Sequence, residues 1–337
     1  MSVLQSRALR SAGAGLCALW LAAAATSAAA ADSKSAANYP SRPVRVIVPF
    51  APGGGADVIA RLVFAKLQAR LGQPFVIDNR GSAGGIVGTD AVAKAAPDGY
   101  TLLLGQTGPN AINPSLFNKM PYDPIRDFAP VIQLTAYPYV IVANPKVPVK
   151  SLKDLIDQSK AKPDSFTFGS AGTGSSGQLA GELFMRTVGI KMTHVPYKGA
   201  GPALSDTLAG NISLTFGDIA ASTPLVRAGQ LRALAVTGPK RTPLLADVPT
   251  VAESGYPGFD AQAWHAVYAP AGTPKPIIDK LNTELAAVLK DPEIQERFAK
   301  DGIEAVGKSP EDFARYTKEE VDKWGATVRA AGIKLDY

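Results

Sequence analysis

The chain alternates between two hydrophobic patterns. Short runs of apolar and β-branched residues predict strands, and longer segments with an apolar residue at every third or fourth position predict helices. Strands are predicted at residues 44–50, 75–78, 100–105, 166–169, 192–197, 212–216 and 231–237. Helices are predicted from the first glycine turn to Gly72, from residues 84–85 to residues 97–99, and at 151–160, 178–188, 202–209, 276–290, 292–300 and 310–330. This alternation indicates an α/β fold with parallel strands.

Two further apolar segments predict that the chain passes twice between two lobes. Residues 131–143 form a long extended stretch, and residues 263–269 predict a strand that returns to the first half. Two crossings create a hinge, with a cleft between the lobes. The predicted first lobe comprises residues 32–135 and 259–337, and the second lobe residues 136–258.

Two short stretches share one pattern although they lie far apart. Residues 46–57 and residues 166–178 each run from an apolar strand through glycines into a helix, and the second stretch adds Ser and Thr side chains. A glycine-rich turn at a helix start leaves backbone N–H groups pointing outward, at the positive end of the helix dipole. Two such turns predict two facing anion-binding loops, which suit the capture of a small acid better than its conversion.

The first 31 residues predict export. Two arginines precede the apolar run at residues 12–25, and a small-residue cleavage site follows near Ala30 or Ala31. The run is shorter than the ~20 residues that a membrane span needs. Cys17, the only cysteine of the chain, lies inside this signal peptide. The processed chain is therefore expected to have no disulfide and no cysteine-bound metal.

The charge of the chain is mildly basic. The formal net charge is +6, and it falls to +4 when Arg7 and Arg10 are removed with the signal peptide, because no acidic residue leaves. Lys and Arg are dispersed among acidic residues, so no nucleic-acid partner is predicted.

The sequence offers little support for catalysis. Its two histidines, His194 and His265, are isolated from each other, and no serine lies in a G-x-S-x-G elbow. No His or acidic pair has the spacing of a metal site. We therefore predict no enzymatic activity, no metal and no cofactor.

Two glycine motifs resemble nucleotide-binding signatures. Residues 172–177 satisfy G-x-G-x-x-G between a strand and a helix, but no acidic residue ends the next strand to bind a ribose. Residues 302–309 match the spacing of a phosphate loop. Their context differs, because Gly302 ends a helix and Ser309 precedes the next one, with Pro310 at its first position. An exported dinucleotide-binding enzyme stays a less favoured alternative.

Several longer strings together resemble the Bug-type receptors of tripartite tricarboxylate transporters. These strings are residues 40–50 followed by glycines and Asp57, then 78–80, 96–103, 196–203, 231–237, 247–250 and 269–274. They cover nearly the whole chain after the signal peptide. The resemblance implies a two-lobed periplasmic binding protein of a type II-like fold, with two crossover segments and an interlobe cleft. It implies a monomer that closes on a small carboxylate and delivers it to the membrane permease subunits.

The resemblance also implies which residues contact the carboxylate. The two glycine-rich loops supply most of them, and Gln106 lies at the carboxyl end of a predicted strand, where ligands meet parallel sheets. The candidate ligand-binding residues are Phe50, Gly53, Gly54, Gly55, Asp57, Gln106, Ser170, Gly172, Thr173, Gly174, Ser175, Ser176, Gln178 and Asp218.

At two of these positions the chain departs from the family pattern. Gln178 stands where the family often has His, and Gly217 stands where an Asp is common, with Asp218 one residue later. Both changes favour a ligand other than the commonest ones: a dicarboxylate or tricarboxylate, an aromatic acid and an amino acid all stay open. A ligand-sensing adaptor for a membrane kinase is an alternative function.

Overall fold

The computed structural model describes residues 38–81 and 83–336, so the predicted signal peptide lies outside the described residues. The strands are β1 (Val44–Val48), β2 (Phe75–Asn79), β3 (Thr101–Gln106), β4 (Phe128–Ala143), β5 (Thr167–Ser170), β6 (Thr193–Pro196), β7 (Leu214–Asp218), β8 (Arg232–Val236), β9 (Gln262–Pro270) and β10 (Glu304–Ala305). The helices are α2 (Gly55–Leu71), α3 (Ile86–Ala93), α4 (Asn113–Leu116), α5 (Leu152–Ala161), α6 (Ser176–Val188), α7 (Ala200–Ala209), α8 (Ile219–Arg227), α9 (Lys275–Leu289), α10 (Pro292–Lys300) and α11 (Pro310–Ala331). Short helical turns are η1 (Ala83–Gly85), η2 (Gly108–Ile112) and η3 (Pro243–Leu245).

One sheet of 10 strands joins the described elements. Its order is β2-β1-β3-β9-β4-β7-β5-β6, with β8 and β10 also paired to β4. Strand β1 runs parallel to β2 and β3, and β5 runs parallel to β6 and β7. By contrast, β9 is antiparallel to β3 and β4, and β4 is antiparallel to β7 and β8. The predicted parallel pairing is thus present among β1, β2 and β3 and among β5, β6 and β7, whereas the two crossing strands and β8 pair antiparallel.

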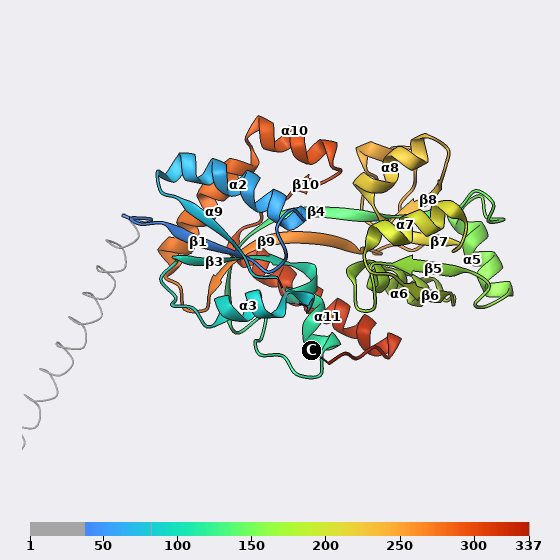
Figure 1. Ribbon diagram of the computed structural model, residues 1–337, viewed down its shortest axis with the longest axis horizontal. Coiled ribbons are helices and arrows are strands. Elements are labelled where there is room, and N and C mark those ends of the chain that lie inside the picture. Colours follow the sequence, from blue (N-terminus) through green and yellow to red (C-terminus); the bar gives the residue numbers. More distant parts are fainter. Residues whose placement is uncertain (1–37, 82, 337) are drawn as a thin grey trace, which may run out of the picture.

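The two crossing strands connect two lobes. Figure 1 shows β4 and β9 passing from a lobe that carries β1–β3, α2, α3, α9 and α10 to a lobe that carries β5–β8 and α5–α8. We call these the first and second lobes. The two strands pair with each other from Phe128↔Pro270 to Pro138↔Gln262. The two predicted crossings at residues 131–143 and 263–269 thus correspond to β4 and β9, whereas the lobe limits at 135/136 and 258/259 stay a prediction.

Helix α11 lies along both lobes. It packs against η2, α4, β4 and α9, and also against α6 of the second lobe. One hydrophobic cluster accordingly runs across the junction, from Leu103 and Trp264 to Phe168 and Phe184. Burial of this shared apolar surface stabilises the arrangement of the lobes as well as each lobe itself.

Several predicted boundaries differ from the structure. Helix α3 ends at Ala93, short of the predicted 97–99, because Pro97 disfavours helical geometry in the residue before it. Helix α8 was not predicted: it is short, contains Pro224 and begins because the Asp218 side chain accepts hydrogen bonds from Ala220 N and Ala221 N. The segment at residues 110–130, where no element is predicted, holds most of η2 and all of α4.

The phosphate-loop spacing at residues 302–309 is coincidental, as its context indicated. Gly302 follows α10 and precedes β10, and the Ser309 hydroxyl caps α11 by accepting a hydrogen bond from Asp312 N. Within residues 38–81 and 83–336, no helix combines the length and the apolar character that a membrane crossing requires.

Candidate functional site

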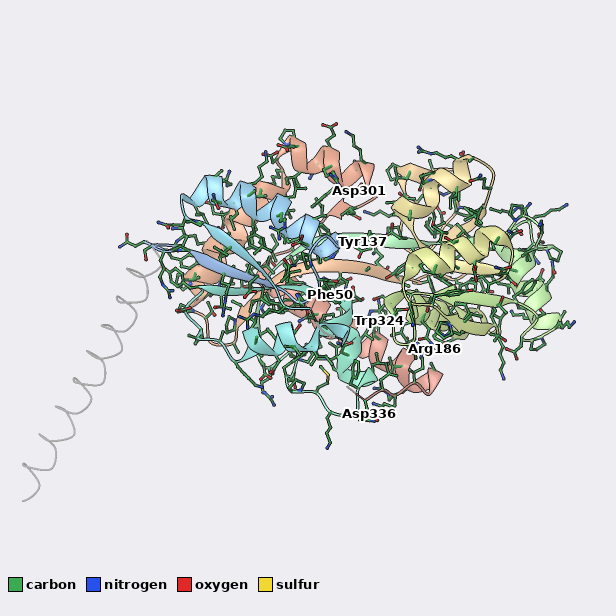
Figure 2. All side chains as sticks on the ribbon, in the orientation of Figure 1. Phe50, Tyr137, Arg186, Asp301, Trp324 and Asp336 are labelled. Carbon is green, nitrogen blue, oxygen red and sulfur yellow. The ribbon has the colours of Figure 1, made fainter. Side chains whose placement is uncertain are left out.

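A cavity of about 400 Å³ lies between the two lobes. The first lobe contributes Phe50, Gly84, Gln106, Gly108, Pro109 and Asn113 to its wall. Tyr137 and Tyr139 reach it from the crossing strand β4, and both lie on the same face because they are two residues apart. Figure 2 labels Phe50 and Tyr137 near the middle of the molecule, where the lobes meet. The cavity therefore occupies the predicted interlobe cleft.

Helix starts supply much of the polar wall. Helices α6, α7 and α8 of the second lobe all begin at the cavity, and η2 of the first lobe begins there as well. Helix α7 is preceded by Gly199, which offers no side-chain cap. The first N–H groups of a helix have no partner within the helix and lie at the positive end of its dipole. Several such ends around one cavity favour an anionic ligand.

Asp218 is the one charged side chain among the described residues that line the cavity. One of its carboxylate oxygens caps α8, so the N-terminus of that helix offsets the negative charge. With neither Lys, Arg nor His in this part of the wall, the described residues can hold a carboxylate only through backbone N–H groups and neutral side chains.

Gln106 lines the cavity and carries a buried side-chain donor. Its backbone N–H donates to Asn110 Oδ1 at 3.0 Å, whereas its side-chain nitrogen is buried with no hydrogen-bond partner. An unpaired buried donor costs about 1–3 kcal/mol. A ligand oxygen toward which the Gln106 amide turns would remove that cost.

Four predicted residues of the second-lobe loop line the cavity, namely Ser170, Gly174, Ser175 and Ser176. Three others, Gly172, Thr173 and Gln178, lie outside this lining.

The Gln178 side chain supports the loop from behind. Its Oε1 accepts a hydrogen bond from Gly174 N at 2.7 Å, and its Nε2 donates to Glu182 Oε1 at 3.4 Å. The Gln178 side chain therefore accepts the hydrogen bond of the Gly174 N–H, a group that we predicted to bind the ligand. A direct ligand contact by Gln178 stays a prediction.

Of the five residues predicted in the first-lobe loop, Phe50 is the one that lines the cavity. Asp57 is 4% exposed, and its Oδ2 accepts hydrogen bonds from Arg61 Nε at 2.9 Å and Gly53 N at 3.0 Å. The hydrogen bond from Arg61, and to a lesser extent the one from Gly53 N, holds the pKa of Asp57 below its usual value. In this arrangement Asp57 stabilises the start of α2, and contacts of Gly53, Gly54, Gly55 and Asp57 with a ligand stay predictions.

Part of the first-lobe wall was not predicted from the sequence. Gly84 and Asn113 come from separate segments, and Asn113 Nδ2 donates to Gly84 O at 2.7 Å. Gly84 and Gly85 both have positive φ, and a Cβ on Gly85 would lie 3.1 Å from the Phe50 ring. The Gly-Gly pair at a helix start was a usable signal for Gly84. The short segment that carries Asn113 had no comparable sequence signal.

The structure brings His194 and Ser170 together. Ser170 lies on β5 and His194 on the neighbouring strand β6, and the distance from Ser170 Oγ to His194 Nε2 is 2.7 Å. The sequence gives no sign of this pair because parallel strands place residues 24 positions apart side by side.

His265 supports the cavity wall from the crossing strand β9. Its Nδ1 lies 3.0 Å from Thr135 Oγ1, and its ring stacks on Tyr137 with centroids 5.6 Å apart. Burial lowers the pKa of His265 to about 4, because a charged imidazolium loses its hydration there.

We expect this burial to make stability depend on pH. The unfolded chain takes up a proton on His265 near pH 6.5 while the folded chain resists it to about pH 4, so acidification favours unfolding. At about 1.4 kcal/mol per unit, His265 should contribute a loss of about 2 kcal/mol between pH 7.5 and pH 5. Urea unfolding of the wild type and His265→Gln at both pH values measures it. Equal pH slopes in the two proteins would rule this contribution out.

No group of three or more His, Cys, Asp or Glu residues within the described ranges is arranged to hold a metal ion. The G-x-G-x-x-G string at residues 172–177 lies between β5 and α6. Its Ser175 hydroxyl caps α6 by accepting from Gln178 N, which gives the motif a structural role without a nucleotide.

Comparison with known proteins adds a family to this geometry. The family model described as "Tripartite tricarboxylate transporter family receptor" matches residues 59–333. Protein BugT of Bordetella pertussis is 42% identical over 302 residues, which are 89% of this chain and 93% of BugT. A solved structure titled "R. palustris Rpa4515 with adipate" is 41% identical with a TM-score of 0.75, and the match covers 88% of this chain and 100% of that one. The structure of MatC from Rhodopseudomonas palustris with bound malate is 35% identical with a TM-score of 0.72, covering 86% of this chain and 100% of that one.

Proposed function

The chain belongs to the family of tripartite tricarboxylate transporter receptors, and on this basis we propose that it captures a small carboxylate between its lobes and delivers it to a membrane permease. One observation carries the proposal: the interlobe cavity at which three second-lobe helices begin. Their N-termini favour an anion in a space closed off by two lobes.

The relatives support a carboxylate as the ligand class. Rpa4515 was solved with adipate and MatC with malate, and this chain covers the whole of both. Both acids carry two carboxylates joined by a short carbon chain. The cavity of about 400 Å³ falls within the usual size range of small-molecule sites.

Binding follows from the position of the donors on both lobes. A carboxylate first contacts one lobe, and its remaining acceptor atoms then draw the other lobe closed. Hydrogen bonds to a charged group contribute about 1.5–3 kcal/mol each. A few of them, less the cost of ordering, account for micromolar affinity, or about −8 kcal/mol.

Three further features belong to the same proposal. The N-terminal signal peptide directs the chain to the periplasm, the processed receptor works as a monomer, and its closed form is recognised by the permease subunits. Two solved relatives, titled "Structure of a periplasmic transporter" and "Structure of periplasmic binding protein BugD", support the periplasmic location. We propose neither a cofactor nor an enzymatic activity for this role.

A thermal-shift screen tests the function. The full chain is expressed, the processed protein is purified from the periplasm, and Tm is measured with adipate, malate, citrate, an aromatic acid, an amino acid, NAD and NADP. A saturable rise with one carboxylate is expected, because a ligand that binds only the folded state stabilises it. A rise with NAD or NADP alone would instead favour the dinucleotide-binding alternative.

We expect Gln106→Leu to separate binding from stability. The substitution removes a buried donor that has no partner, so the free energy of unfolding should be unchanged or slightly higher. It should weaken carboxylate binding by about 10- to 100-fold, the equivalent of one charge-assisted hydrogen bond. Calorimetric titration and urea unfolding give the two values. Unchanged affinity would place Gln106 outside the ligand contacts.

A further inference from the structure

His194 lies between the wall of the cavity and the outside of the second lobe. Its Nε2 is 2.7 Å from the hydroxyl of Ser170, which is 3% exposed and lines the cavity. Its ring packs against Phe168, with centroids 5.0 Å apart. On its other side, the half-buried imidazole faces an outer groove of about 480 Å³ between α6, β6 and the end of α11. Arg186, which also lines this groove, is labelled beside the end of α11 in Figure 2.

The Ser170 hydroxyl links the imidazole to the second-lobe loop. It accepts a hydrogen bond from Gly172 N at 3.2 Å, and it lies 3.1 Å from Gly172 O, to which it can donate. A hydroxyl has one proton to donate. When Nε2 of His194 carries no proton, the Ser170 hydroxyl donates its hydrogen bond to Nε2. When His194 is protonated, Nε2 is itself a donor, and the hydroxyl proton turns to Gly172 O.

The protonation of His194 also changes the charge behind the loop. The described wall of the cavity holds no cationic side chain, and its one charged group is Asp218. A protonated His194 would therefore be a positive charge that lies one hydroxyl group away from the cavity surface. A bound carboxylate favours that charged form, because opposite charges at short range stabilise each other where water is excluded.

We propose that His194 is a positioning residue that couples carboxylate binding in the cavity to proton uptake from the outer groove. The inference rests on the proposed function, since it needs an anionic ligand. By linkage, a carboxylate that favours the protonated imidazole must bind more tightly when His194 is protonated. The factor by which its affinity rises equals the factor by which it strengthens proton binding to His194. Affinity should rise as the pH falls and level off once His194 is protonated in the free protein.

Other charged groups around His194 set the pH range. The outer groove is also lined by Asp164, Glu182, Arg186 and Lys191, two acids and two bases, while α11 contributes uncharged residues to it. Burial lowers the pKa of His194 below its ordinary value of 6.5 and raises that of Glu182 above its ordinary 4.5. The free imidazole is therefore mostly neutral at pH 7, and a ligand that raises the pKa of His194 increases its protonated fraction.

Nuclear magnetic resonance of the histidine rings tests the coupling directly. The chain has two histidines, and His194→Gln assigns their signals. His265 is an internal control, because burial lowers its pKa to about 4 and it stays neutral above pH 5. Saturation with adipate or malate, whichever raises Tm more, should move the His194 titration upward by about one unit. A midpoint that does not move on saturation would overturn the proposal.

The pH profile of affinity separates coupling from a purely structural role. Between pH 8 and pH 5, the affinity of the wild type for the same acid, divided by that of His194→Gln, should rise about tenfold toward the acidic end, the equivalent of one pKa unit. In His194→Gln the amide keeps a hydrogen bond to Ser170 and cannot titrate, so its pH profile should follow only the protonation of the acid itself and of groups other than His194. A pH dependence that survives in His194→Gln and disappears in Asp218→Asn would overturn the inference and assign the proton to Asp218.

Two different results separate a missing His194 coupling from missing carboxylate binding. If the wild type binds adipate or malate with a pH profile identical to that of His194→Gln, only the coupling is overturned. If no carboxylate of the screen raises Tm at either pH 5 or pH 8, the proposed function falls and the coupling falls with it.

Discussion

Gly201→Leu is expected to weaken carboxylate binding by about 100-fold or more, or about 2.7 kcal/mol, while the protein stays folded. Gly201 is the second residue of α7 and lines the cavity. A Cβ built there meets no atom within 4 Å, and the backbone is not in the left-handed region. The new side chain therefore extends into the space that the ligand needs, and a helix tolerates Leu better than Gly.

The last residue of the same helix supplies the matched control. Ala209 is exposed and lies outside the cavity lining, so Ala209→Leu should bind adipate or malate as the wild type does. Calorimetric titration measures the affinities, and urea unfolding verifies that both variants are folded. Wild-type affinity in Gly201→Leu would show that the ligand binds elsewhere.

Gly174 in the second-lobe loop would be a poor choice for the same experiment. Its φ is +80°, and a Cβ there would lie 2.6 Å from Leu116 of the first lobe. Any side chain at this position would strain the loop and push the lobes apart at once. Loss of binding in such a variant would not distinguish a blocked cavity from a displaced lobe.

Glu320→Ala is expected to lower the free energy of unfolding by about 3–5 kcal/mol. Glu320 lies on α11 and is 2% exposed. Its Oε2 accepts hydrogen bonds from Trp264 Nε1 of the crossing strand β9 and from Trp324 Nε1, both at 2.9 Å, and Lys323 pairs with its Oε1. Removal of the carboxylate leaves two buried indole donors without their acceptor and breaks the ion pair of Lys323, which keeps its hydrogen bond to Asp260 O.

The neighbouring residue isolates this effect from the loss of a helix-surface acid. Glu319 is exposed on the same helix, and Glu319→Ala should change stability by less than about 0.5 kcal/mol. Glu320→Gln keeps one acceptor oxygen, so its loss of unfolding free energy should lie between those of Glu320→Ala and Glu319→Ala. Urea unfolding at pH 7.5 provides all three values. A loss below about 1 kcal/mol in Glu320→Ala would mean that the indole groups find other partners.

Local features of the structure followed directly from the sequence. Apolar periodicity located α2, α10 and α11 to within about two residues, and the Ser309-Pro310 pair marked the start of α11. The same local logic identified the two glycine-rich turns as helix starts. These features depend on residues within one or two turns of each other, so a single chain segment contains the information.

The candidate site depended on contacts between distant segments. Sequence placed Gln178 in the ligand loop, but its amide supports Gly174 from behind. It separated His194 from Ser170, which adjacent strands bring within 2.7 Å. Tyr137 and Tyr139 reach the cavity because β4 alternates its faces as it crosses the hinge.

The sequence by itself determined the α/β pattern, the two crossings and, through its family resemblance, the class of protein. The tertiary structure decided that β4 and β9 run antiparallel, which donors surround the cavity and which residues of the predicted loops take part. The reason is physical: helix periods and caps are set by neighbours in the chain. Strand register and side-chain pairing are set by packing between distant segments, such as those of Thr135 and His265, which are 130 residues apart.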